Sequence, residues 1–145
     1  MRFAARFLFM DIKGNFSEII RKFEERQKKM RDGLRTATEK ATAYAHSQVP
    51  PYPPKSPTSR YERTGTLGRS IATAVRELGS SFVGVIGTKV IYAPYVISDA
   101  ALSDGRGPQT PVHKRNNWWT LQGVVRGAKD EIMKIYKRVI DEVAK

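Results

Sequence analysis

The chain has 145 residues, which is the size of one ordinary domain with one core. It contains no cysteine, so disulfides, thiolate metal sites and cysteine nucleophiles are excluded, and only His46 and His113 can supply imidazole. Its 26 basic and 14 acidic residues give a net charge of +12, which favours contact with a polyanion or an acidic protein surface.

No apolar run approaches the roughly 20 residues that a membrane-spanning helix needs. Arg6 and Asp11 interrupt the best candidate, residues 3–12. Asp11 and Lys13 also follow this segment where a signal peptide would carry small cleavage-site residues. We therefore expect a soluble protein without membrane contact, whose domain begins at Met1.

The first expected element is a strand over residues 2–13. Apolar and polar residues alternate there, with Phe3, Phe7 and Phe9 on one side. Gly14 ends this strand, and Asn15 with Glu18 resembles a capping box. The pattern predicts a long helix from about residue 16 to about residue 47.

The apolar residues of this helix recur at spacings of three, four and seven: Phe16, Ile19, Ile20, Phe23, Met30, Leu34, Ala37, Ala41 and Tyr44. At 1.5 Å per residue the helix is roughly 48 Å long. A domain of this size cannot cover that length, so part of the helix should project or pack on a neighbouring subunit.

A proline-rich loop at about 49–60 follows the helix. Prolines fix the backbone and remove amide donors, so neither a helix nor a central strand can pass through Pro50, Pro51, Pro53, Pro54 and Pro57. We interpret the loop as a spacer between helix and sheet. The alternative is a ligand for an aromatic groove.

Residues 64–71 predict a short helical turn that leads into a β-hairpin. Its strands are expected at about 71–78 and 81–89, with Gly79-Ser80 as the turn. Gly84 and Gly87 in the second strand indicate a bulge or a close backbone approach. Residues 92–97 predict another short turn or helix, and residues 109–113 a short strand.

The last expected element is an amphipathic helix capped by Thr120. One apolar stripe defines it: Leu121, Val124, Val125, Ala128, Ile132, Ile135, Tyr136, Val139, Ile140 and Val143. Together the elements predict an α+β fold. A small antiparallel sheet of about four strands packs with the long N-terminal helix and the C-terminal helix, and residues 1–145 form one domain.

The sequence lacks the motifs of a catalytic site. A hydrolase would have to combine Ser70 or Ser98 with His46 or His113, but no nucleophile elbow, paired zinc histidines or phosphate loop accompanies them. We therefore predict no catalysis, no cofactor and no metal.

Two short segments allow alternative interpretations. Thr64-Gly65-Thr66 could cradle a phosphate at a helix start, but Thr66 as a helix cap beside a permissive Gly65 explains the same residues, and we prefer it. Trp118 and Trp119 are adjacent, so we expect one ring in the core and the other free for a partner or for contact with Lys114 and Arg115.

Basic side chains could contact nucleic acid through its phosphates, without reading the bases. No helix-turn-helix, zinc finger or RNA-binding signature is present. The basic residues are Arg21, Lys22, Lys28, Lys29, Arg60, Arg63, Arg69, Lys114 and Arg115.

Three motifs in order resemble a known family. They are Thr-Gly-x-Leu-x-x-Ser-Ile over 64–71, a glycine-spaced strand over 83–87 and Tyr-Ala-x-Tyr-Val over 92–96. This order resembles the siphophage tail-component family typed on the tenth gene product of phage Hong Kong 97, which is related to the phage lambda minor tail protein Z. That family commonly continues with glutamate and glycine, whereas Ile97, Ser98 and Asp99 follow here.

The resemblance implies a structural virion protein that completes the tail or neck and joins head to tail. It implies a ring of six-fold or twelve-fold symmetry between the head connector and the tail-tube or tail-terminator proteins, made in the host cytoplasm, with non-specific contact to packaged DNA. The alternative is a basic nucleic-acid-binding module. The interaction candidates are Arg63, Thr64, Gly65, Leu67, Arg69, Tyr92, Tyr95, Lys114, Arg115, Trp118 and Trp119.

Overall fold

The computed structural model describes the backbone of residues 2–60 and 62–145, and the side chains from residue 16 onwards within these ranges. It combines helices with a small antiparallel sheet. In chain order the elements are α1 (Arg2–Ser47), α2 (Thr66–Ser70), β1 (Ala72–Leu78), β2 (Ser81–Gly87), α3 (Pro94–Ile97), α4 (Pro111–Arg115) and α5 (Leu121–Val143).

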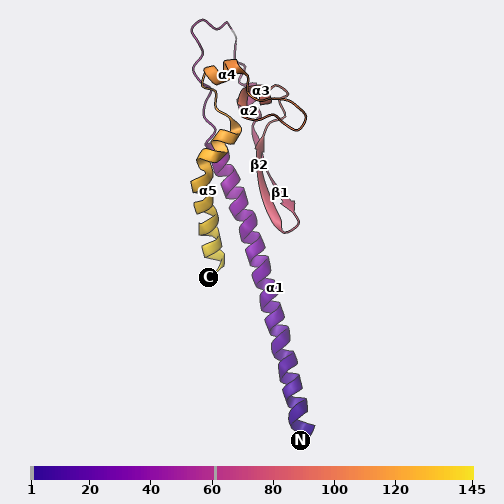
Figure 1. Ribbon diagram of the computed structural model, residues 1–145. Helices are drawn as coiled ribbons and strands as arrows, with labels where there is room; N and C mark the ends of the chain where they lie inside the picture. The colour runs from indigo at the N-terminus through magenta and orange to yellow at the C-terminus, as the bar shows by residue number, and fades with distance from the viewer. Residues whose placement is uncertain (1, 61) are drawn as a thin grey trace.

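The long helix α1 is the axis of the molecule, and α5 lies antiparallel along its C-terminal half (Figure 1). Small residues allow the two helices to approach closely, because Ala37, Ala41 and Ala45 are buried on α1 and Ala128 and Val139 are buried on α5. The helix α5 ends beside Gly33, where an added Cβ atom would lie 2.6 Å from Val143 Cγ2. Gly33 therefore permits the contact that closes this helix pair.

Polar groups between these helices are paired. The buried Thr38 hydroxyl lies 2.8 Å from the Leu34 carbonyl oxygen and 2.7 Å from the Tyr136 hydroxyl of α5. The Thr42 hydroxyl donates to the Thr38 carbonyl at 2.6 Å. These bonds offset the cost of placing hydroxyls in a packed interface.

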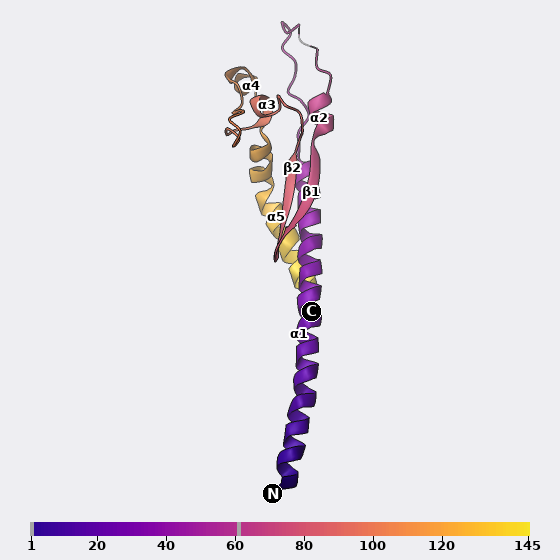
Figure 2. The ribbon, with the colours of Figure 1, turned by 90° about the vertical axis from the view of Figure 1, so that its right-hand side faces the viewer.

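The hairpin of β1 and β2 packs on another side of α1 (Figure 2). Its register pairs Leu78 with Ser81 across the Gly79-Ser80 turn, as the sequence predicts, and Gly79 has the positive φ of 61° that such a turn requires. Gly84 lies against α1, where an added Cβ would overlap Thr42 Oγ1. The prediction of a close backbone approach is therefore confirmed at Gly84.

Ion pairs hold the tip of the hairpin to α1. Glu77 on β1 forms salt bridges with Arg31 and Arg35, the latter at 3.1 Å. Both guanidinium groups also lie over the Phe82 ring of β2, at 5.9 and 5.6 Å from its centroid. These contacts involve partly exposed groups, so they orient the hairpin more than they stabilise it.

A separate apolar cluster lies at the other end of the hairpin, where α2 and α3 meet. Its buried members are Leu67, Ile71, Ala93, Val96 and Ile97. Partly buried residues from the proline-rich loop, β2 and the start of α5 surround them: Val49, Tyr52, Ile86, Val90, Trp118, Trp119 and Leu121. This cluster fixes the segment that carries the predicted interaction residues.

Three sequence predictions about the fold are wrong. The expected strand over 2–13 is part of α1, so no helix starts at the proposed Asn15 cap. A glycine inside a helix lowers the stability of the helix by only about 1 kcal/mol, so Gly14 does not end it. The expected strand over 109–113 is instead α4, whose first residue is Pro111. The sheet in the described chain therefore has two strands rather than about four.

The projecting part of α1 confirms the prediction that this helix outruns the domain (Figure 2). Phe16 and Phe23 are 62% and 63% exposed, and Ile19 and Ile20 lie beside them with about half of their surface exposed. We call residues 16–32 of α1 the arm. Its apolar stripe is uncovered in the part of the chain that the structure describes.

Candidate interaction site

The first and last of the motifs that carry the family resemblance come together at the end of the molecule formed by α2, α3 and α4 (Figure 1). Leu67 of the first motif is 3% exposed and packs in one cluster with Val96 of the last motif. Leu67 is therefore a core residue. The exposed members of these motifs are the ones free to meet a partner.

The turn before α2 depends on Gly65, which has a φ of 72° and occupies the N-cap position. Thr66 is the first residue of the helix, so its predicted role as the cap is wrong, whereas the permissive role of Gly65 is confirmed. The guanidinium of Arg69 folds back over the turn and donates to the Thr64 carbonyl at 2.8 Å. Its charge therefore fixes the turn.

Two amides of α2 have partners within the chain. The Gly68 amide donates to the Tyr52 hydroxyl at 2.5 Å, and the Arg69 amide donates to the Gly65 carbonyl at 3.2 Å. A phosphate cradle needs free amides at a helix start. The geometry therefore favours a structural turn over the phosphate-binding interpretation.

Trp118 lies at the centre of an aromatic group. Its ring is 5.1 Å from the Tyr52 ring and 5.5 Å from the His113 imidazole, and the Arg63 guanidinium lies 5.1 Å from its centroid. Arg63 also donates to the carbonyl of Pro53. Arg63 thus ties the proline-rich loop to Trp118.

Both tryptophans are half-buried, so the expected division into one core ring and one free ring is not found. The two rings do face different neighbours, because Trp119 Nε1 donates to the Pro51 carbonyl at 3.1 Å on the other side. The proline-rich loop supplies a surface for each ring. Its course over both tryptophans could not be read from the sequence.

An open cavity of about 480 Å³ adjoins this aromatic group. We call it the head cleft. Its lining combines aromatic, hydroxyl and basic groups and contains no carboxylate: Tyr52, Ser59, Arg63, Thr64, Gly65, Thr66, Leu67, Tyr92, Tyr95, Val96, Val112, His113, Asn116 and Trp118. Tyr92 and Tyr95 are its most exposed aromatic residues, at 46% and 40%. The cleft can therefore bury apolar or aromatic groups beside a positive charge.

Seven of the eleven predicted interaction residues line the head cleft, and four do not. Arg69 and Trp119 make the internal contacts given above. Lys114 and Arg115 lie exposed on α4, next to the lining residue His113. Sequence reasoning missed Tyr52, His113 and Val112 as cleft residues, because their place depends on how two loops fold over each other.

His113 couples the cleft to solution pH. Burial lowers the pKa of His113 below 6.5, and the Arg63 guanidinium lowers it further, although a hydrogen bond with the Tyr95 backbone opposes the change. The imidazole Nδ1 also lies 2.7 Å from Thr110 Oγ1. The folded chain therefore favours neutral His113.

This shift predicts a loss of stability in acid. Because the unfolded chain binds the proton more tightly, the contribution of His113 is fully present above about pH 6.5 and is lost as the pH falls through the folded-state pKa. We expect the free energy of unfolding to fall as the pH drops below about 6.5. His113→Gln should flatten this slope in urea titrations, and an unchanged slope would contradict the assignment.

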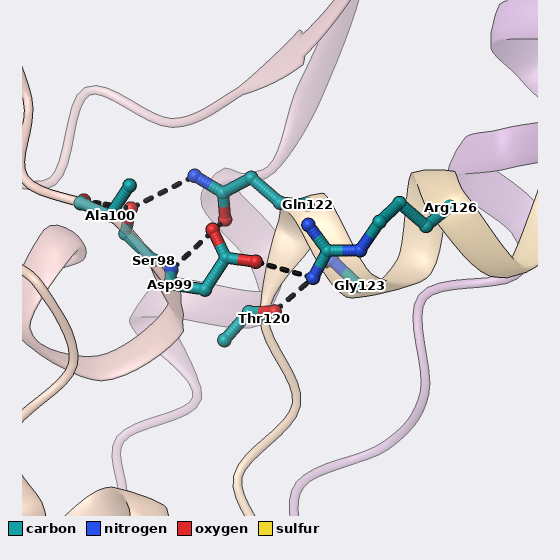
Figure 3. Close-up of polar contacts among 7 residues, drawn as sticks. All are labelled: Ser98, Asp99, Ala100, Thr120, Gln122, Gly123 and Arg126. Carbon is teal, nitrogen blue, oxygen red and sulfur yellow. Dashed lines mark hydrogen bonds and ion pairs between the residues drawn. The ribbon is translucent and has the colours of Figure 1, made fainter.

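The segment after α3 is anchored to the start of α5 (Figure 3). The Ser98 hydroxyl donates to the Ala100 carbonyl at 2.7 Å and accepts from Gln122 Nε2 at 2.9 Å. The Gln122 side-chain oxygen accepts from the Asp99 amide at 3.3 Å. These bonds join the residues that depart from the family pattern to α5.

The same junction contains the cap of α5. Thr120 Oγ1 accepts from the Gly123 amide at 3.1 Å, which confirms the predicted cap, and the Asp99 carboxylate forms an ion pair with Arg126 one turn further on (Figure 3). A second side chain, Gln109, donates to the carbonyls of Val96 and Trp118. The end of the molecule formed by α2, α3 and α4 is thus held together by polar contacts as well as by its apolar cluster.

The serine and histidine candidates for a hydrolase do not meet. Ser70 bonds to the Leu67 carbonyl and to Thr88, whereas His46 lies 3.2 Å from the Ile71 carbonyl oxygen. Ser98 and His113 have the partners given above. No serine and imidazole of these four are joined by a hydrogen bond in the described residues.

No group of three or more histidine and carboxylate side chains within the described ranges is arranged to hold a metal ion. None of the helices that the structure describes combines the length and the apolar composition of a membrane-crossing segment.

Comparison with known proteins found no matching family model, no matching curated protein and no matching solved structure.

Proposed function

We propose that this chain is a structural protein of a tailed-bacteriophage virion, a tail-completion or neck subunit that assembles as a ring and joins head to tail. Its partners are further copies of itself, the head connector and the tail-tube or tail-terminator proteins. It acts in the virion after synthesis in the host cytoplasm, and it needs neither a cofactor nor catalysis.

The observation that carries the proposal is the uncovered arm. An apolar stripe on a helix is stable in water only when another surface covers it, and exposed apolar patches of this kind mark protein interfaces. Phe16, Ile20 and Phe23 have no cover from the rest of the described chain. The family resemblance adds a ring of identical subunits as the setting in which such an arm is covered.

The test is deletion of the gene from the phage or prophage that carries it, followed by negative-stain electron microscopy of the lysate. The proposal predicts filled heads that lie apart from finished tails. Expression of the intact chain in trans should restore joined particles. Intact, infectious particles without the chain would refute a required virion role.

A second candidate is a basic nucleic-acid-binding module. It is favoured by the net charge of +12 and by the basic groups at the head cleft, where Arg63 lies in the lining and Lys114 and Arg115 follow on α4. A dedicated DNA binder should bind well alone and lose affinity steeply with added salt. A neck subunit should bind DNA poorly until it is assembled, so a salt series of DNA binding separates the two functions.

A further inference from the structure

The exposed apolar stripe of the arm is continuous with an apolar stripe on the C-terminal part of α1, which α5 covers. Phe16, Ile20, Phe23, Met30, Leu34, Ala37 and Ala41 follow the alternating spacing of four and three that two packed helices share, with one polar interruption at Gln27. The helix α5 covers the C-terminal part and ends at Gly33. Within the described chain, the stripe therefore loses its partner at the point where α5 stops.

The hairpin has a second uncovered apolar surface. Gly84 and its pairing partner Val75 face α1, so the neighbouring pairs of the register face away from it. We call this opposite side the outer sheet face. It consists of Ala72, Ala74, Arg76 and Leu78 on β1 and of Ser81, Val83, Val85 and Gly87 on β2.

The part of the outer sheet face away from the hairpin tip is hollow because most residues there are small. A hollow of about 640 Å³ lies over Ala72, Ala74, Val85 and Gly87, and an added Cβ at Gly87 would meet no atom within 4 Å. The hollow contains Arg76 and Lys89 but no carboxylate. Neither of these two basic groups forms a salt bridge with a described residue.

The arm and the outer sheet face match in shape and length, and one acidic residue of the arm has basic counterparts beside the face. The arm presents bulky phenylalanine and isoleucine side chains, whereas the hollow part of the face presents Ala72, Ala74 and Gly87. The arm is roughly 26 Å long at 1.5 Å per residue, and a strand of seven residues is about 23 Å long. Glu24 adjoins Phe23 on the arm and has no salt bridge with a described residue, so it can meet Arg76 or Lys89.

We propose that the arm of one copy packs across the outer sheet face of the next copy. Each copy then uses two different surfaces, and such head-to-tail contacts produce a closed ring when the rotation between neighbours closes. The inference rests on the proposed assembly of identical copies and identifies its interface. It also explains how a sheet of only two strands is stabilised, since a helix of the neighbouring copy covers its outer face.

Cysteine cross-linking tests the pairing directly, because the natural chain contains no cysteine. Ile20→Cys places a thiol on the arm, and Ala74→Cys places one on the outer sheet face. The inference predicts that an oxidised mixture of the two variants forms a covalent dimer at least several-fold more efficiently than either variant alone. Ile20→Cys mixed with Lys129→Cys, on an exposed part of α5, is the matched control and should not cross-link.

Efficient cross-linking of Ile20→Cys alone would show that two arms pair with each other and would overturn the proposal. Absence of a dimer in the mixture, at the highest concentration at which the chain stays dissolved, would also overturn it. Both substituted positions are exposed, so circular dichroism of each variant should match the natural chain.

Mixing two variants, each with one of the two surfaces disrupted, gives an independent test of the interface. Phe23→Asp removes the arm contact and Ala74→Asp removes the face contact, so each variant should be monomeric in light scattering. Mixed together, they retain one good surface each and should form a pair that grows no further. Failure of pairing would remove this interface but would leave the gene-deletion result for the neck role unaffected.

Discussion

Leu67→Ala is expected to lower the free energy of unfolding by about 2–5 kcal/mol, the usual cost of emptying a buried leucine site. Leu67 is 3% exposed and lies at the centre of the cluster with Val96 and Ile97. The cavity would loosen α2 against α3, so the head cleft should lose its shape with the core. Urea unfolding followed by tryptophan fluorescence measures both effects, since Trp118 and Trp119 pack on this cluster.

The matched control is Leu78→Ala at the tip of the hairpin. Leu78 is 62% exposed, so the same truncation should change the free energy of unfolding by no more than about 0.5 kcal/mol. Equal losses for the two variants would show that Leu67 is not the core residue that its burial indicates.

Gly84→Ala should lower the free energy of unfolding by about 1–3 kcal/mol, because a methyl group there overlaps Thr42 Oγ1 and forces the hairpin away from α1. Thr42 is buried and its hydroxyl is bonded to the Thr38 carbonyl, so it cannot turn aside without losing that bond. Gly87→Ala in the same strand meets no atom within 4 Å.

The comparison of these two glycine variants isolates the close approach of sheet and helix. Gly87→Ala should unfold at nearly the same urea concentration as the natural chain, whereas Gly84→Ala should unfold at a clearly lower one. If Gly84→Ala is as stable as Gly87→Ala, the hairpin does not lie against α1 as described.

The parts of the fold that local sequence determines were predicted well. The Gly79-Ser80 turn fixed the register of the hairpin, and Thr120 marked the start of α5. Both features depend on residues close together in the chain. The expected length of the long helix also led to the correct prediction that part of this helix extends beyond the rest of the domain.

The errors arose where one pattern fits two structures. Residues 2–13 alternate as a strand does, but Phe3 with Phe7 and Leu8 with Ile12 are also spaced four apart, as in a helix. Pro111 begins α4 in a segment whose β-type residues suggested a strand. A strand also needs a partner to complete its hydrogen bonds, and the sequence of one segment does not show whether a partner exists.

The candidate site was predictable as a set of residues but not as a surface. The motifs contain half of the head-cleft lining, whereas their division into core and exposed members required the packing of α2 on α3. The outer sheet face was not predicted, because its hollow depends on the pairing of Ala74 with Val85 and of Ala72 with Gly87. Small residues on one face become informative only when the strand partners are known.

The most direct test of the proposed virion role is the position of the chain in purified particles. A compact protein label joined to Lys145 through a flexible linker replaces no residue of the arm or of the outer sheet face. Cryo-electron microscopy of labelled, infectious particles should show the added density as a ring at the junction of head and tail. Purified particles that contain no copy of the chain would contradict the proposal.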